Sequence, residues 1–257
     1  MRTSIFVILF AFIISCTNAT ENGIKWHSFD EGLAKAQTEN KFLLVDFYTD
    51  WCGWCKRLDS EVYSNSKIIE YMNKYFVAVK LNPEKPGSVT FQGKNYSSAE
   101  FTKSAGVSGY PATGFLTSKA EFVSVVPGYL PANDFYDLLE FFVNGTYLKV
   151  SFQDYRLYLQ MQKVAVNDPA NADVNFFLGY FNYEVMKDYK EAEQYFWKTV
   201  DKNPSFGEVY LCLSEIASSR GEKSKSDEYK QKAESLGVSN FNSFNNKMVE
   251  ILKKYMK

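Results

Sequence analysis

The sequence predicts an α/β domain followed by an all-α domain. Up to residue 143, apolar runs of strand length alternate with segments that begin with helix-capping residues. From Tyr147 onwards the strand patterns end, and aromatic residues recur at helical spacing. We therefore expect a signal segment at 1–19, the α/β domain at 20–146 and the helical domain at 147–257.

The overall composition is that of a folded chain with little net charge. Of the 257 residues, 46% are hydrophobic, which is ample for a packed core. The formal net charge is −1, and the lysines are scattered among glutamates and aspartates. This balance gives no electrostatic reason to bind nucleic acid.

The first residues have the pattern of an export signal. Arg2 supplies a positive charge before the apolar run 5–14, which is too short to span a membrane. Cleavage after Thr-Asn-Ala at 17–19 is one possibility, whereas the segment that ends in Cys16 resembles the lipobox of bacterial lipoproteins. We favour a lipid on Cys16. In both cases we expect an extracytoplasmic protein, in the bacterial periplasm or anchored to the membrane as a lipoprotein.

The α/β domain opens with an edge segment, a helix and a buried strand. Residues 23–27 are mixed in polarity, and Ser28 and Glu31 form the capping-box pattern of a helix start. The run 42–48 is apolar on both faces except at Asp46, as is typical of a central strand covered by helices. Burial raises the pKa of a carboxyl group, so Asp46 could exchange protons near neutral pH.

The motif Trp-Cys-Gly-Trp-Cys-Lys follows this strand at 51–56. A cysteine at a helix start meets unpaired N–H groups and the positive end of the helix dipole, which both favour the thiolate. Cys52 is therefore a candidate nucleophile, and Cys55, one helical turn later, can close a disulfide with it. In an oxidising compartment such a pair is more typical of a redox active site than of a structural disulfide.

Half of a zinc site is the alternative interpretation of this cysteine pair. Zinc would need two more ligands with suitable geometry. The chain has one histidine, His27, which precedes a helix cap, and its other cysteines are Cys16 and Cys212. Cys212 lies between two leucines and is expected to be a buried apolar residue. We therefore favour redox chemistry and expect no metal ion and no cofactor beyond the Cys52–Cys55 disulfide.

Further strands and capped helices complete the α/β domain. Ser97 and Glu100 repeat the capping-box pattern, and Pro111 lies at the start of a strand, where its missing N–H is tolerated. The polar segment 82–96 contains prolines and glycines and is expected to be a loop insertion. The predicted strands are 76–81, 112–116 and 121–126, and the predicted helices are 52–62, 64–74, 97–106 and 131–143.

Several of these positions together resemble the thioredoxin superfamily over about 26–143. The matching positions are the cysteines, a buried carboxylate, a strand lysine, a glycine and a proline opposite the active site, and a later glycine: Cys52, Cys55, Asp46, Lys80, Gly109, Pro111 and Gly128. The form Cys-Gly-Trp-Cys-Lys looks most like extracytoplasmic bacterial members, and it is similar to the C-terminal domain of the bacterial membrane protein that carries reductant outward. The resemblance implies a thioredoxin fold, a central mixed sheet flanked by helices, with a cis bond before the proline.

The resemblance also implies a thiol–disulfide oxidoreductase and assigns roles to its residues. Cys52 would attack a substrate disulfide, Cys55 would resolve the mixed disulfide, and Asp46 would accept the proton of Cys55. The partners would be protein thiols and disulfides and an upstream redox partner. The residues that would frame the docking groove for a peptide are Trp51, Trp54, Tyr110 and Pro111.

Two stretches of the helical domain resemble tetratricopeptide repeats. The first runs from Phe176 to Pro204, and the second from Tyr210 to Ala233. The first departs by about one residue from the usual spacing, and the second lacks the small alanine before its second helix. Because stacks of this kind usually need three repeats or caps, we expect flanking helices at 151–166 and 241–256. Such a domain would offer a surface to a protein partner.

We expect the protein to reduce protein disulfides, with clients or partners selected by the helical domain. One alternative is the same chemistry run as an oxidase or isomerase, because Gly53-Trp54 matches neither the commonest reductase dipeptide nor the strongly oxidising one. The other alternative is a non-catalytic binding or chaperone protein on a redox-inert scaffold. The intact cysteine pair argues against inertness.

Overall fold

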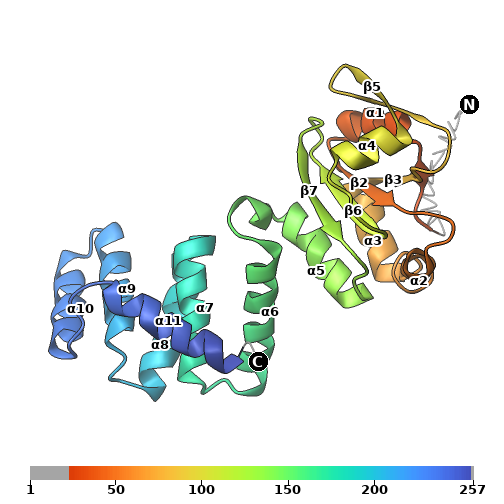
Figure 1. The fold of residues 1–257 in the computed structure, drawn as a ribbon. Helices are drawn as coiled ribbons and strands as arrows, with labels where there is room; N and C mark the ends of the chain where they lie inside the picture. Colours follow the sequence, from red (N-terminus) through yellow and green to blue (C-terminus); the bar gives the residue numbers. More distant parts are fainter. Residues whose placement is uncertain (1–22, 256–257) are drawn as a thin grey trace, which may run out of the picture. The chain divides into compact units, whose positions relative to one another are not determined.

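The computed structural model describes residues 23–255, which divide into two compact units (Figure 1). The first unit ends at Ala132, and the second begins at Asn133. The expected signal segment, including Cys16, lies outside the described residues. Within 23–255 no helix is both long enough and apolar enough to span a membrane.

The first unit is built on a mixed five-stranded sheet with the strand order β1-β3-β2-β6-β7. Strand β3 runs parallel to β1 and β2, whereas β6 runs antiparallel to β2 and β7. β2 is the central strand, as its apolar faces predict. The strands are β1 (Trp26–His27), β2 (Phe42–Phe47), β3 (Phe76–Leu81), β6 (Ala112–Leu116) and β7 (Phe122–Pro127).

The helices of the first unit begin where the capping residues predict. Both capping boxes form, with Ser28 at the start of α1 (Phe29–Glu39) and Ser97 at the start of α4 (Ser98–Ser104). Helix α1 packs closely on the sheet at Gly32, where an added Cβ would lie 2.4 Å from Val79 of β3. The other helices are α2 (Gly53–Glu61) and α3 (Ser66–Tyr75).

The expected loop at 82–96 is wrong, because most of it folds as a hairpin. Strands β4 (Ser88–Phe91) and β5 (Lys94–Ser97) pair antiparallel around a two-residue turn. Gln92 and Gly93 have φ angles of 50° and 74°, the left-handed values that suit such a turn to twisted strands. Val89 of β4 is buried in the main core, and this gives the hairpin an apolar anchor.

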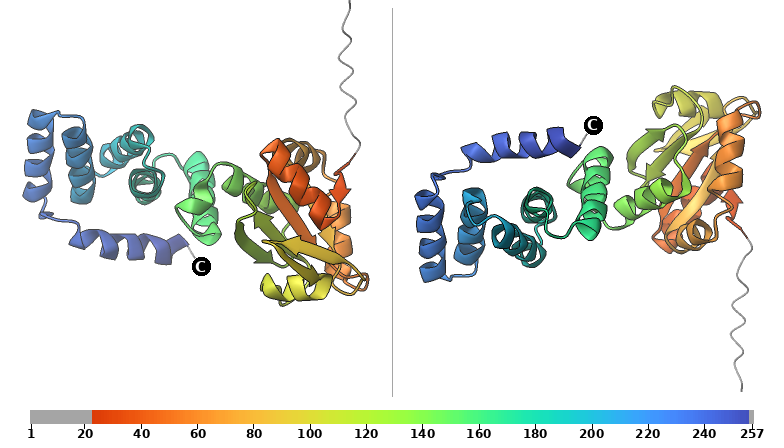
Figure 2. Two further views of the ribbon diagram at one scale, coloured as in Figure 1. Left: turned by 90° about the horizontal axis from the view of Figure 1, so that it is seen from above. Right: turned by 90° about the horizontal axis from the view of Figure 1, so that it is seen from below.

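The second unit is helical, as predicted. Consecutive helices pack against one another from α6 to α10 (Figure 2). Helix α7 continues into a π-helical turn at Asn182–Met186, and a short 3₁₀ turn at Thr146–Leu148 precedes α6. The helices are α5 (Ala132–Val143), α6 (Phe152–Asn167), α7 (Ala172–Phe181), α8 (Tyr189–Lys202), α9 (Gly207–Ser219), α10 (Lys223–Ser235) and α11 (Asn242–Tyr255).

Small residues lie at the helix contacts of this unit. A Cβ on Gly179 of α7 would lie 2.6 Å from the ring of Phe196 of α8, and Ala233 of α10 is fully buried. Helix α11 returns to α7, where the rings of Phe244 and Phe176 are 5.4 Å apart. The flanking helices are confirmed as α6 and α11, whereas the assignment of tetratricopeptide repeats stays a prediction.

Candidate active site

Two neighbouring strands bring the predicted site residues to the same end of the sheet. Phe47, at the end of β2, pairs with Ala112, at the start of β6. Because the two strands are antiparallel, the segment that leads from β2 to Cys52 and the segment that ends in Pro111 lie at the same end of the sheet. Residues about 60 positions apart in the sequence thus lie close together, because antiparallel pairing places the end of one strand beside the start of the other.

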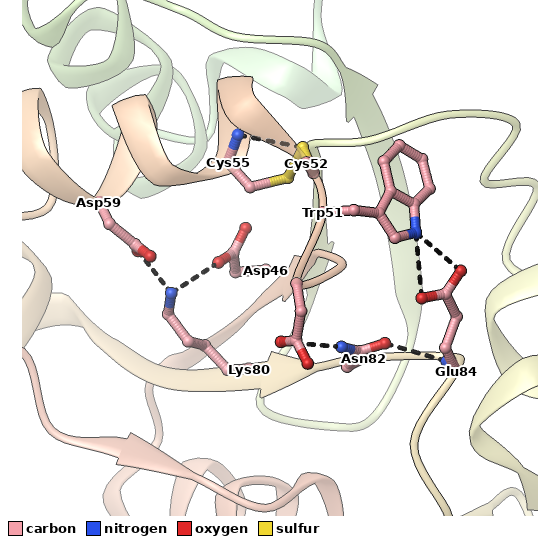
Figure 3. Close-up of a disulfide and its surroundings, with 9 residues drawn as sticks. Asp46, Trp51, Cys52, Cys55, Asp59, Lys80, Asn82 and Glu84 are labelled. Atoms are coloured by element: carbon pink, nitrogen blue, oxygen red, sulfur yellow. Dashed lines mark hydrogen bonds and ion pairs between the residues drawn. A yellow bond between two sulfur atoms is a disulfide. The ribbon is translucent and has the colours of Figure 1, made fainter.

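Cys52 and Cys55 form a disulfide at the start of α2 (Figure 3). Cys52 is the N-cap residue, and its Sγ accepts the backbone N–H of Cys55 at 3.0 Å. A sulfur in this position receives the partial positive charge of the helix start, which favours a Cys52 thiolate once the disulfide is reduced. The cysteines themselves are buried, each with 4% of its surface exposed.

Asp46 is a buried carboxyl group beneath this disulfide. It is 1% exposed, and Figure 3 shows one of its oxygens pointing toward the cysteines and the other toward Lys80. Burial raises the pKa of Asp46 to about 7, and the nearby Lys80 cation offsets only part of that effect. A carboxyl group with this pKa can both accept and release a proton near neutral pH.

Lys80 is held by two carboxylates and a set of aromatic rings. Its Nζ lies 3.4 Å from Asp46 Oδ2 and also forms an ion pair with Asp59 of α2. The ammonium group lies 5.0 Å from the ring centres of both Trp26 and Tyr48. Sequence reasoning missed Asp59, although it follows Cys55 by four residues and therefore lies on the same face of the helix.

Trp51 is exposed beside the disulfide and is fixed by a carboxylate. Its indole Nε1–H donates to both carboxylate oxygens of Glu84, at 2.9 and 3.1 Å (Figure 3). Its ring meets the ring of Tyr110 edge to face, with centres 6.2 Å apart. Trp51 keeps 67% of its surface exposed. Glu84 was missed because it follows β3 in an irregular segment with no pattern that points to an indole 33 residues away.

Trp54 lies in a second aromatic group, which already contains a cation. Its ring is 5.4 Å from that of Tyr129, and the Arg57 guanidinium lies over both rings, at 5.3 and 5.2 Å. Glu61 accepts hydrogen bonds from Arg57 Nε at 2.7 Å and from the Tyr129 hydroxyl at 2.6 Å. We call these four residues, Trp54, Arg57, Glu61 and Tyr129, the Trp54 cluster.

The peptide bond between Tyr110 and Pro111 is cis, as the resemblance implies. The Pro111 carbonyl accepts the N–H of Gly128 at 2.8 Å. Tyr110 forms no backbone–backbone hydrogen bond with any other residue that the structure describes. The main-chain groups of Tyr110 therefore have no main-chain partner within residues 23–255.

The described part of the chain brings no three histidine, cysteine, aspartate or glutamate side chains together in a way that could hold a metal ion. Outside the site, Cys212 is fully buried in α9, as its leucine neighbours predict. His27 forms part of the edge strand β1.

The first unit and α5 match a known family. Residues 29–143 match the model of a thioredoxin-like domain. A putative disulphide-isomerase from Bacteroides thetaiotaomicron, whose structure is solved, is 35% identical, with 94% of that chain and 48% of this one covered and a TM-score of 0.40. Residues 29–143 form a domain of the thioredoxin-like family. The predicted α/β fold is thereby confirmed for this domain.

Two curated proteins are similar to shorter stretches of the thioredoxin-like domain. An uncharacterized protein of Caenorhabditis elegans is 34% identical over 99 residues, 37% of this chain. Protein disulfide-isomerase 5-2 of Arabidopsis thaliana is 42% identical over 43 residues, 17% of this chain. The matches cover 13% and 10% of these relatives, so this chain corresponds to a small part of either.

Proposed function

We propose that this protein is a thiol–disulfide oxidoreductase that acts on protein disulfides. The observation that supports it most is the Cys52–Cys55 disulfide at a helix start above a buried Asp46 whose pKa is about 7. A structural disulfide needs no titratable group beneath it. A redox pair gains from one, because its second thiol acts only after it loses a proton, and a carboxyl group that titrates near pH 7 can accept that proton.

In the proposed reaction the reduced protein transfers two electrons to a client. The Cys52 thiolate attacks a client disulfide, forms a mixed disulfide and releases one client thiolate. Asp46 takes the proton of Cys55, and the resulting Cys55 thiolate attacks Cys52 Sγ. The second client thiolate leaves, and the Cys52–Cys55 disulfide remains. A dithiol donor of the same compartment must then reduce the protein before another cycle.

The exposed aromatic residues and the free backbone of Tyr110 support a polypeptide as the client. Trp51 and Trp54 flank the disulfide with 67% and 53% of their surfaces exposed. An extended chain could place its disulfide at Cys52 and pair with the backbone of Tyr110, as strands do when they add to a sheet edge. Trp51, Trp54, Tyr110 and Pro111 are therefore our proposed docking residues.

We propose reduction as the physiological direction and isomerisation as the second candidate. The second is favoured by the disulfide-isomerase names of two similar proteins. Direction depends on the stability of the disulfide relative to the dithiol. Proteins of this chemistry span from about −270 mV for thioredoxin to about −120 mV for a strong oxidant.

We further propose that the protein is exported and that its helical unit selects the client or partner. The apolar run near the N-terminus supports export, and the stacked helices α6–α11 support a partner surface, since helical-repeat stacks commonly present one. Cys16 is the proposed lipid attachment site. Mass spectrometry of the protein from membranes and from soluble fractions would show whether the chain starts with a lipidated Cys16 or at a later residue.

The decisive test of the function is equilibration with glutathione redox buffers followed by exchange with a protein disulfide. We expect a reversible two-electron transition and rapid reduction of the disulfide by the reduced protein. A potential near −270 mV would favour reduction of clients, and one near −180 mV would favour isomerisation. If the reduced protein has a reactive Cys52 but exchanges with no protein disulfide, the non-catalytic scaffold is the better interpretation.

A further inference from the structure

The face around the disulfide contains the same three residue types twice. In the Trp54 cluster, Trp54, Tyr129 and Glu61 surround the guanidinium of Arg57. On the other side Trp51, Tyr110 and Glu84 are also joined, through the indole N–H of Trp51 and the edge-to-face ring contact. We call this second group the Trp51 patch. It differs from the Trp54 cluster because no lysine or arginine among the described residues lies over its rings.

The carboxylate of the Trp51 patch binds a neutral donor rather than a cation of the described residues. Glu84 binds the neutral indole N–H, and no salt bridge joins it to a cation of residues 23–255. The adjacent Lys85 is already paired with Asp50, at 3.1 Å. Burial raises the pKa of Tyr110, and the negative charge of the nearby Glu84 raises it further.

An exposed indole, a tyrosine ring and a carboxylate together form a surface that attracts cations. Cations bind over the faces of aromatic rings, with tryptophan the strongest, and a nearby carboxylate adds an ion pair. Arg57 shows this arrangement within the same protein, where two rings and one carboxylate hold a guanidinium.

We propose that the Trp51 patch binds an arginine or lysine side chain of the client, close in sequence to the cysteine that Cys52 attacks. This inference rests on the proposed function and adds the class of client: polypeptides with a basic residue beside the reacting disulfide. Glu84 is then a specificity-determining residue that contacts the substrate. Neither the chemistry of exchange nor the choice of Cys52 as nucleophile depends on it.

The test uses the full-length reduced protein and three synthetic peptides that share one cysteine, linked by a disulfide to the same small thiol. The residue beside the cysteine is arginine, glutamine or glutamate. The rate constant kcat/KM is measured for the wild type, for Glu84→Gln and for Glu84→Lys. Gln keeps a carbonyl acceptor for the Trp51 indole and removes the charge, whereas Lys reverses it. Glu70→Gln is the matched control, because Glu70 is an exposed carboxylate on α3, outside the patch.

We expect the wild type to prefer arginine over glutamate by about tenfold, because exposed cation–π contacts and exposed ion pairs are individually weak. The preference should fall in Glu84→Gln, reverse in Glu84→Lys and decrease with added salt, while Glu70→Gln keeps it. Each preference is the ratio of kcat/KM for the arginine and glutamate peptides within one protein, and urea unfolding of the four proteins shows that the variants are folded.

Two kinds of failure are distinguishable. If the wild type exchanges well with the glutamine peptide but treats arginine and glutamate alike, or if Glu84→Lys keeps the wild-type preference, the Trp51 patch does not select basic clients and only this inference is overturned. If none of the three peptides is exchanged, the proposed oxidoreductase function fails and the inference fails with it.

Discussion

Asp46 Oδ2 lies 3.4 Å from Lys80 Nζ, and the same ammonium group is bound by Asp59. The Lys80 ammonium group thus interacts with two carboxylates at once. Lys80 therefore offsets only part of the effect of burial on Asp46, and Asp59 adds a repulsive charge, so the pKa of Asp46 reaches about 7. This arrangement places a proton acceptor for Cys55 in the neutral pH range.

Asp46→Asn should stabilise the protein at neutral and alkaline pH. The carboxyl pKa is about 7 in the folded protein and has an ordinary value of 3.8, so the unfolded chain releases this proton first as pH rises. The folded state consequently loses stability between about pH 4 and pH 7, and asparagine avoids that loss. Above pH 7 we expect a gain on the order of 4 kcal/mol in the free energy of unfolding, measured with urea. A gain that is equally large at pH 4 and at pH 8 would show that ionisation of Asp46 is not its cause.

Asp59→Asn should lower the pKa of Asp46. The substitution removes a nearby negative charge and leaves Lys80 to Asp46 alone. In the proposed reaction the pH midpoint of disulfide exchange should then move to lower pH. Glu70→Gln, which removes one charge from exposed α3, serves as the comparison and should leave the midpoint in place. A midpoint that moves upward in Asp59→Asn would contradict the electrostatic account of this pair.

Cys55→Ser should accumulate mixed disulfides through Cys52, since the first exchange step can occur and the second cannot. Cys52→Ser should accumulate far fewer, because Cys55 is the third residue of α2 rather than its N-cap. Non-reducing gel electrophoresis after incubation with a protein disulfide measures both. Equal trapping by the two variants would mean that the order of attack is wrong.

Gly179→Ala should destabilise the helical unit by about 1–3 kcal/mol, a typical cost of overpacking. The added Cβ would lie 2.6 Å from the Phe196 ring, and that ring is fully buried and cannot move without displacing its neighbours. Gly53→Ala is the matched control for stability, since a Cβ there meets no atom within 4 Å. If both variants unfold at the same urea concentration, the α7–α8 contact is looser than it is in the structure.

A fragment of residues 20–146 should fold and reduce a generic disulfide, while losing much of its preference among natural clients. This boundary keeps α5, which lies within the thioredoxin-like match at 29–143 although the second compact unit begins at Asn133. A fragment that ends at residue 132 lacks α5 and should be less stable to heat. If the longer fragment is folded but inactive, the helical unit contributes to the active site and the proposed division of labour is wrong.

Local patterns along the chain predicted most of the first unit. The apolar run at β2 and the capping boxes at Ser28 and Ser97 depend on neighbours in sequence, and the structure confirms them. The hairpin β4–β5 was missed because its turn uses Gln92 before Gly93, rather than the Asn or Asp that usually identifies such a turn. Val89 and Phe91, two residues apart, were the strand-like apolar signal in this polar segment.

The contacts of the candidate site were harder to predict than its cysteines. Arg57 and Asp59 lie at helical spacing from Trp54 and Cys55, so the sequence does contain a signal for them. Glu84 differs, because its contact with Trp51 exists only once β2 and β3 pair in the sheet and bring together the segments that follow them. Long-range polar contacts of this kind require the strand register, which a single sequence does not provide.

The buried thiol of Cys212 makes it possible to measure how often the helical unit opens. Its thiol is fully buried in α9, and burial raises its pKa well above the ordinary value, so an alkylating reagent meets an inert group while the unit is closed. The reagent can therefore modify Cys212 only when α9 opens, and the rate of modification measures how often α9 opens. Cys52 and Cys55 are held in a disulfide and do not react, so the modification of Cys212 in residues 23–255 would report the opening of the helical unit without any introduced label.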